Sequence, residues 1–168
     1  MICAALLLAL LSVGPGKTYA KPSQTAAAAK DGDTVEIAAG AYPGDVAVWR
    51  ASRLTLCGKG GRVVLNAQGQ SAERKAIWVI QGDDTWVENI EFVGASVPDR
   101  NGAGIRQEGQ GLIVSNCFFY DNENGILWGM TLNPGRMSIA SSPIGSMMMQ
   151  AQIPRTCWIS PTGASAGS

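Results

Sequence analysis

Short hydrophobic runs alternate along most of the chain with turns rich in Gly, Asn and Asp. The runs are rich in β-branched and aromatic residues, as strands are, and nothing between them is long and periodic enough for a crossover helix. Residues Ala76–Phe92 (AIWVIQGDDTWVENIEF) lie over Ala103–Phe119 (AGIRQEGQGLIVSNCFF) at a shift of 27 residues. A fixed period of this size in short strands indicates units that stack on one another. We therefore expect a solenoid with about 22 to 27 residues per coil.

The remaining elements are expected around this repeat. A short helix over 24–30 is predicted, with Ser23 as its N-cap and Gly32 ending it. Such a helix would cover the first coil, because an uncovered solenoid end exposes both core and strand edges. The pattern also predicts turns at 40–44 and 58–61, and strands at 34–37, 45–49, 54–56 and 63–65.

Two asparagines fall at the same place in the repeat. Asn89 and Asn116 each follow the matched valine, and Asn tolerates the left-handed conformation of a tight corner. Stacked amide side chains can also hydrogen-bond along the solenoid axis. We predict that Asn89 and Asn116 stack at one corner and that Phe92 stacks with Phe119 in the core. Two unrelated turn asparagines are the alternative.

Asp31–Tyr42 (DGDTVEIAAGAY) resembles the opening coil of the right-handed parallel β-helix proteins of the pectate-lyase-like superfamily. Those chains often begin with a capping helix and then such a segment, and 87–92 and 114–119 resemble their repeat. The resemblance covers residues 13–127 and implies an all-β fold, a right-handed parallel β-helix (solenoid) with a short N-terminal capping helix. It leaves the activity open, since this scaffold hosts lyases, hydrolases, epimerases and non-catalytic proteins.

The resemblance also extends to particular enzymes. The opening coil is similar to that of chondroitinase-B-like and alginate-lyase-like enzymes, which use a Lys/Arg pair in later coils, often with calcium. The paired-Asp motifs of polygalacturonases are not found, because the doublet Asp83-Asp84 lacks their flanking residues and sits at a predicted corner.

Composition excludes several classes of chemistry. The chain has 13 Lys and Arg against 13 Asp and Glu and no His, so there is no basic footprint for nucleic acid and no Ser-His-Asp, Cys-His or zinc-His site. Its four cysteines form no CxxC pair, which speaks against a zinc site. We expect no metal and no cofactor, and interpret Cys57 and Cys117 as small buried hydrophobes.

The pattern divides the chain into three parts: a signal peptide or leader over 1–20, a parallel β-helix domain over 21–127, and an unstructured or frameshifted tail over 128–168. The apolar run Ile2–Val13 is too short to span a bilayer and fits the core of a signal peptide. A mis-assigned start codon within a longer leader is the alternative. On the first interpretation the protein is secreted, periplasmic or on the cell surface, with no transmembrane segment.

The chain changes character after Leu127. Another coil opens at Asn124, yet residues 128–168 contain no Asp, Glu or Lys and hold five of the six methionines. Three successive ATG codons read two bases later give GAT, which encodes Asp. Read in that frame, the codons of Met147–Met149 would therefore encode acidic residues, which suit a β-helix. We hypothesise that a frameshift replaced the remaining coils. A natural tail rich in Ser, Gly and Pro is the alternative.

The best polar cluster in the predicted coils is a candidate carbohydrate-binding site. With Ile105 inward, the period of two places Arg106 and Glu108 outward, and Asp99 and Arg100 lie in the loop before them. A lyase acting on uronic acids needs a cation to neutralise the carboxylate and a base to remove the α-proton. Ordinary solvated charges and a surface ion pair are the alternative. Sugar rings could stack on Trp49, Trp78 or Trp86, of which Trp78 aligns with a core position.

These observations favour an exported β-helix repeat protein that is carbohydrate-associated and not catalytically complete, with no catalytic residues assigned. One alternative is a polysaccharide lyase or epimerase-like enzyme acting on uronic-acid polymers, and another is a structural surface repeat protein. The expected partner is a polysaccharide, and an exposed terminal coil is expected to promote self-association.

Overall fold

A computed structural model describes residues 8–128 and 138–139 of the 168-residue chain. Its elements in order are β1 (Leu10–Val13), α1 (Pro22–Ala28), β2 (Thr34–Pro43), β3 (Ala47–Trp49), β4 (Thr55–Asn66), β5 (Ala76–Ile80), β6 (Trp86–Glu88), β7 (Ile90–Val93), β8 (Ala103–Gln107), β9 (Ile113–Ser115), β10 (Phe118–Tyr120), β11 (Asn124–Trp128) and β12 (Ser138–Ile139).

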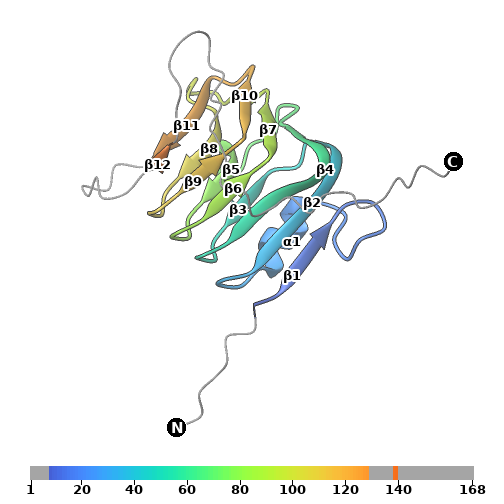
Figure 1. Ribbon diagram of the computed structural model, residues 1–168. Coiled ribbons are helices and arrows are strands. Elements are labelled where there is room, and N and C mark those ends of the chain that lie inside the picture. The colour runs from blue at the N-terminus through green and yellow to red at the C-terminus, as the bar shows by residue number, and fades with distance from the viewer. Residues whose placement is uncertain (1–7, 129–137, 140–168) are drawn as a thin grey trace, which may run out of the picture.

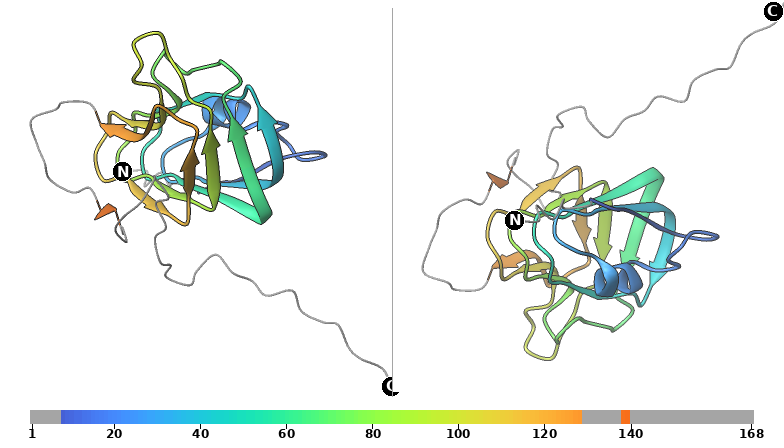
Figure 2. Two further views of the ribbon diagram at one scale, coloured as in Figure 1. Left: turned by 90° about the horizontal axis from the view of Figure 1, so that it is seen from above. Right: turned by 90° about the horizontal axis from the view of Figure 1, so that it is seen from below.

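The strands form a right-handed parallel β-helix, as the sequence predicts. Every pairing between two named strands is parallel, which is how successive coils of a solenoid meet. Strands β3, β5, β8 and β11 form one sheet, which we call the short sheet, and the other eight form the long sheet. Figure 1 shows the coils stacked in chain order from β1 to β11, and Figure 2 shows the same stack from above and below.

The 27-residue repeat is confirmed residue by residue. Ala76 pairs with Ala103 in the short sheet, and Phe92 pairs with Phe119 in the long sheet. Asn89 and Asn116 both adopt left-handed backbone conformations, with φ of 57° and 48°. The side-chain amide of Asn116 donates to the side-chain oxygen of Asn89, so the amide ladder at this corner exists. Its left-handed turn lets the chain pass from β6 to β7 within one residue and from β9 to β10 within two.

A column of aromatic side chains forms the centre of the core. The rings of Trp49, Trp78, Phe92 and Phe119 contact one another in that order, with centroid separations of 5.1, 5.2 and 5.0 Å. The two phenylalanine rings are stacked at 6°, and the other two contacts are edge-to-face. All four side chains are buried, so the column links three coils through the interior.

The predicted helix is present, but its cap is different. The helix ends at Ala28, before Gly32, and Lys21 occupies the N-cap. Ser23 lies inside the first turn, where its backbone N–H donates to Asp45 Oδ2 (3.0 Å) and its hydroxyl to Oδ1 (2.5 Å). A carboxylate from the segment before β3 therefore satisfies this end of the helix, which explains why Ser23 is not needed as a cap.

Two predicted turns lie within strands. Residues 40–43 belong to β2 and 58–61 to β4, because the glycines let each strand bend around a corner, where the pairing of the two strands shifts register and then resumes. Gly58 allows the close approach, since a Cβ there would lie 2.2 Å from the carbonyl oxygen of Asn89. Coil length also differs from the expectation: Thr55 pairs with Trp86, 31 residues on. The excess over 27 lies within β4, because the pairs Val63–Ile90 and Ala76–Ala103 return to a shift of 27 residues.

Parts of the two terminal segments belong to the solenoid. Strand β1 pairs with Thr34–Ile37 of β2, and Val13 is fully buried. A leader that ends at residue 20 stays a prediction, and cleavage there would remove this strand. In the tail, the structure describes Ser138–Ile139, which pair with β9. Apart from Trp128 and this pair, the predicted tail lies outside the described residues.

Candidate functional site

The outer face of the short sheet carries the candidate site. Along β5 and β8, Trp78 and Ile105 belong to the main core, whereas Val79 packs in a second, outer apolar cluster. Arg106 lies in register between Val79 and Leu127 and is half-buried. The period of two therefore places Arg106 outward as expected. Its Nε atom is buried and has no hydrogen-bond partner among the described residues.

A long loop supplies the second part of the site. Residues Ala67–Lys75, here called the β4–β5 loop, connect the long sheet to β5. Ala72 from this loop packs on Ala76, Val79 and Ala103 in the outer cluster. The loop thereby places its charged residues beside the outer face of the short sheet.

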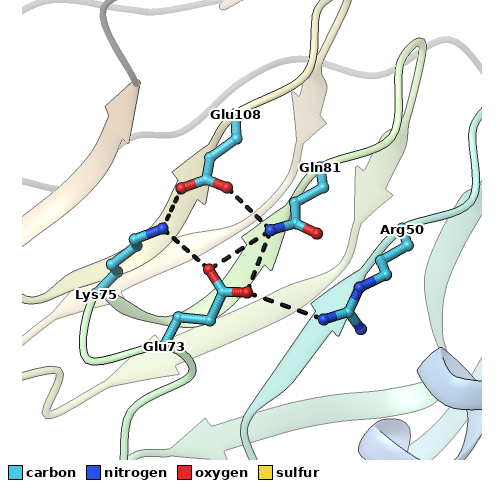
Figure 3. A network of polar contacts seen from close by, with 5 residues as sticks. All are labelled: Arg50, Glu73, Lys75, Gln81 and Glu108. Atoms are coloured by element: carbon cyan, nitrogen blue, oxygen red, sulfur yellow. Dashed lines mark hydrogen bonds and ion pairs between the residues drawn. The ribbon is translucent and has the colours of Figure 1, made fainter.

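Five polar side chains meet there in one network, shown in Figure 3. Lys75 Nζ lies 2.5 Å from Glu108 Oε1 and 2.9 Å from Glu73 Oε2. Gln81 Nε2 donates to Glu108 Oε2 (3.0 Å) and Glu73 Oε1 (3.2 Å), and Arg50 lies 3.9 Å from Glu73 Oε1. The network comprises Arg50, Glu73, Lys75, Gln81 and Glu108.

The strand register explains why three of these residues meet. Arg50, Gln81 and Glu108 each come directly after a short-sheet strand, and the preceding residues Trp49, Ile80 and Gln107 are register partners. The three side chains therefore project from the same edge of three successive coils. Glu73 and Lys75 reach them from the β4–β5 loop.

The network fixes the protonation of its two closest partners. The hydrogen bond from Lys75 holds the pKa of Glu108 below its ordinary value, and Gln81 and the charges of Lys75 and Arg106 act in the same direction against desolvation. The same hydrogen bond, followed by the one to Glu73, raises the pKa of Lys75. At neutral pH Glu108 is a carboxylate and Lys75 an ammonium ion, so Lys75 offers no lone pair for proton removal.

The four residues proposed from the sequence divide into two pairs. Arg106 and Glu108 lie near enough for the arginine charge to lower the pKa of Glu108. Asp99 and Arg100 are exposed on the loop between β7 and β8. There the Arg100 charge acts on Glu123, whose Oε2 accepts from the backbone N–H of Gly102 at 2.6 Å. The structure thus keeps Arg106 and Glu108 in the candidate site and associates Arg100 with a loop contact.

The other four members of the network were not identified from the sequence. For Arg50 and Gln81 a sequence signal existed: each directly follows a strand, β3 or β5, that aligns with the strand β8 before Glu108. Glu73 and Lys75 gave no such signal, because their contribution depends on the path of the β4–β5 loop. The contact between Lys75 and Glu108 joins residues 33 positions apart.

The tryptophans proposed for sugar stacking are core residues in two of three cases. Trp49 and Trp78 are fully buried in the aromatic column, so neither can stack on a ligand. Trp86 is half-buried, with its Nε1 atom inside. Among the tryptophans that the structure describes, the exposed one is Trp128, which is 61% exposed, ends β11 and pairs with Gln107 of β8. It lies one coil beyond Glu108.

A second polar cluster lies on the long sheet. Arg62 Nε donates to Glu91 Oε1 (2.6 Å), its terminal nitrogen lies 2.5 Å from Oε2, and the Tyr120 hydroxyl donates to Oε2 (3.1 Å). Hydrogen bonding from Arg62 lowers the pKa of Glu91, whereas burial and then Glu91 raise the pKa of Tyr120. These contacts tie successive coils together.

The part of the chain that the structure describes lacks two other kinds of feature. No group of three or more His, Cys, Asp or Glu side chains among the described residues could hold a metal ion. None of their helices has the length and apolar character needed to cross a membrane.

Comparison with known proteins gives a structural match. No protein-family model matches the chain, and no curated protein matches its sequence. Among solved structures, the chain is similar to a pectin methylesterase mutant crystallised in complex with a hexasaccharide, at 15% identity and a TM-score of 0.39. The match covers 70% of this chain and 49% of that one, so the chain spans about half the length of the methylesterase.

Proposed function

We propose that this β-helix protein is exported and binds polysaccharide on the outer face of its short sheet without being a complete catalyst. The observation that carries the proposal is the network of Figure 3, in which charged and amide side chains of three coils converge. Arg106 lies near enough for its charge to lower the pKa of Glu108 in this network. Sugar hydroxyls both donate and accept hydrogen bonds, and Glu108 and Gln81 supply matching partners. This surface also offers cations for the carboxylates of a uronic-acid polymer.

Two residues extend this surface beyond the network. Arg106 presents a half-buried guanidinium beside the network, and a ligand carboxylate could pair with its charge. Trp128 offers an exposed indole one coil further on, and aromatic rings pack well against the apolar faces of sugars. Together they would place a charge contact and a stacking contact on adjacent strands.

The protonation of the network argues against complete catalysis. A uronate lyase needs a base as well as a cation, and the raised pKa of Lys75 keeps that residue protonated at neutral pH. The polysaccharide-lyase alternative therefore lacks its base at this position. We expect no unsaturated uronate product from pectate, alginate or chondroitin in an ultraviolet assay. Clear product that disappears in Arg106→Ala would favour the lyase alternative.

Binding is tested by affinity electrophoresis in gels that contain polygalacturonate or, in parallel, neutral dextran. We expect polygalacturonate to retard the protein, and Arg106→Ala to weaken the interaction by about tenfold or more through loss of a charged hydrogen bond. Arg62→Ala is the matched control, because it removes an arginine from the long sheet instead. Equal retardation of Arg106→Ala and the parent, or an equal loss in both variants, would contradict the proposal.

Export and self-association belong to the same proposal and are tested separately. N-terminal sequencing of the protein from its native source shows whether residues 1–20 are removed, and cell fractionation distinguishes the periplasm, the cell surface and the medium. Sedimentation measures association through the terminal coil, where Trp128, Tyr120 and Ile113 are exposed.

A further inference from the structure

The β4–β5 loop has little apolar attachment to the sheet it lies against. Gln68, Gly69 and Gln70 are exposed, and so are Glu73 and Arg74, while Ala72 is its one buried residue between Gln68 and Lys75. A segment with so few buried contacts belongs to the part of a fold that opens most easily.

The backbone of this loop is also held in uncommon conformations. Gln68, Glu73 and Arg74 have φ values of 46°, 50° and 57°, in the left-handed region that residues with a side chain rarely adopt. Glu73 and Arg74 are adjacent, so two consecutive residues carry this cost at the tip. Backbone hydrogen bonds close the turn itself, since the Lys75 N–H donates to the Ala72 carbonyl and the Ala72 N–H to the Ala76 carbonyl. Side-chain contacts hold the closed turn against the sheet.

Glu73 supplies most of these side-chain contacts. Its carboxylate pairs with the ammonium group of Lys75, accepts a hydrogen bond from the Gln81 amide and forms an ion pair with Arg50. Because Arg50 follows β3 and Gln81 follows β5, Glu73 connects the loop tip to the ends of both strands. Glu108 in turn holds Lys75 and Gln81 from the next coil. Most of these groups are partly open to solvent, with Arg50 70% and Lys75 38% exposed, so dissolved ions can screen or compete for their contacts.

We propose that the β4–β5 loop is an ionic latch, closed by Glu73 and released when salt or an anionic ligand competes for Arg50 and Lys75. Release frees Ala72 from the outer apolar cluster and uncovers Ala76, Val79 and Ala103 on the short sheet. The latch is a property of the free chain. Only its value for exposing an apolar strip to sugar rings rests on the proposed function, so its test uses no polysaccharide.

The test is hydrogen exchange, followed by mass spectrometry, of a peptide that covers the loop. The reporters are the amide of Ala72, which donates to the Ala76 carbonyl at 2.7 Å, and that of Lys75, which donates to Ala72 at 2.9 Å. Raising NaCl from about 0.02 to about 1 M shortens the screening length from roughly 20 to roughly 3 Å. We expect this to speed loop exchange in the parent by about five- to tenfold, the combined effect of a few exposed ion pairs.

Glu73→Gln should exchange fast at low salt and lose the salt response. Glu91→Gln is the control, because it removes a carboxylate paired with arginine on the long sheet and should leave loop exchange as in the parent. Arg50→Gln removes one partner of Glu73, so its loop exchange rate should lie between those of Glu73→Gln and Glu91→Gln. It replaces Glu73→Gln in the test if that variant does not fold. Trypsin cleavage after Arg74 should follow the same order.

Several results would overturn the latch. They are a loop in the parent that exchanges at the unprotected rate already at low salt, a parent loop that does not respond to salt, and a Glu73→Gln loop as protected as that of the parent. Equal acceleration in Glu73→Gln and Glu91→Gln would also overturn it, because it would show general loosening of the fold. Failure to bind polysaccharide would leave all these readouts in place.

Discussion

Removing the ring of Phe92 should destabilise the protein more than removing the ring of Phe119, its neighbour in the aromatic column. Phe92 is fully buried and contacts Trp78 on one side and Phe119 on the other. A buried ring removes about 150 Å² from water, which at about 25 cal/mol per Å² is worth about 4 kcal/mol. Because Phe92 packs against a ring on each side, we expect Phe92→Ala to cost about 4–5 kcal/mol, the upper part of the range for such changes.

The measurement is equilibrium unfolding in urea, with the slope of the transition checked for constancy. Phe119→Ala is the first comparison, because Phe119 has one ring neighbour and its truncation should cost about 3 kcal/mol. Ile113→Ala is the second, since Ile113 is 38% exposed and should cost less than about 1 kcal/mol. The double variant of Phe92 and Phe119 should show a coupling of about 0.5–1.5 kcal/mol.

A cost below about 1.5 kcal/mol for Phe92→Ala would refute the continuous column, since no fully buried ring is removed at so small a cost. If Phe119→Ala lowered the free energy of unfolding more than Phe92→Ala, the argument that a ring with two aromatic neighbours contributes more than a ring with one would be refuted.

Three further predictions follow from single side chains. Asn116→Ala should cost about 1–2 kcal/mol in urea unfolding, because Ala tolerates the left-handed corner poorly and loses the bond to Asn89, and Asn116→Gly should recover part of this. The Cys117 thiol, whose pKa burial raises to about 12, should resist iodoacetamide in the native protein and react after unfolding, as peptide mass spectrometry shows. Because Arg62 lowers the folded-state pKa of Glu91, their contribution to stability is present above the unfolded pKa and lost as pH falls through the folded value. Glu91→Gln should therefore flatten the acid side of the stability profile below about pH 4.5, and an unchanged profile would count against this pair.

The sequence predicted those features in which two coils repeat the same side chain at the same offset. Phe92 over Phe119 and Asn89 under Asn116 follow from one shift of 27 residues, because parallel coils that stack in register bring identical positions together. Arg106 followed from alternation along a single strand. In each case the information was local or strictly periodic.

The parts that the sequence did not predict depend on where long side chains and loops go. The β4–β5 loop folds back against the short sheet and brings Glu73 and Lys75 to Gln81 and Glu108. Likewise Arg100 is close to Arg106 along the chain, yet its charge acts on Glu123, which accepts a hydrogen bond from the backbone N–H of Gly102 in the same loop. Contacts between residues far apart in an irregular loop have no period to reveal them.

The stacking of the coils also has a mechanical consequence. Hydrogen bonds between parallel coils run along the solenoid axis, so a tensile force applied through the two ends of the chain would open them in sequence, as a zipper opens, and not all at once. At one end α1 packs against β3, while β11 has β8 as its one strand partner in the described chain. Rupture should begin at β11 and advance by one coil per event. With 27 residues between Trp86 and Ile113, each event should release roughly 90–95 Å of extended chain.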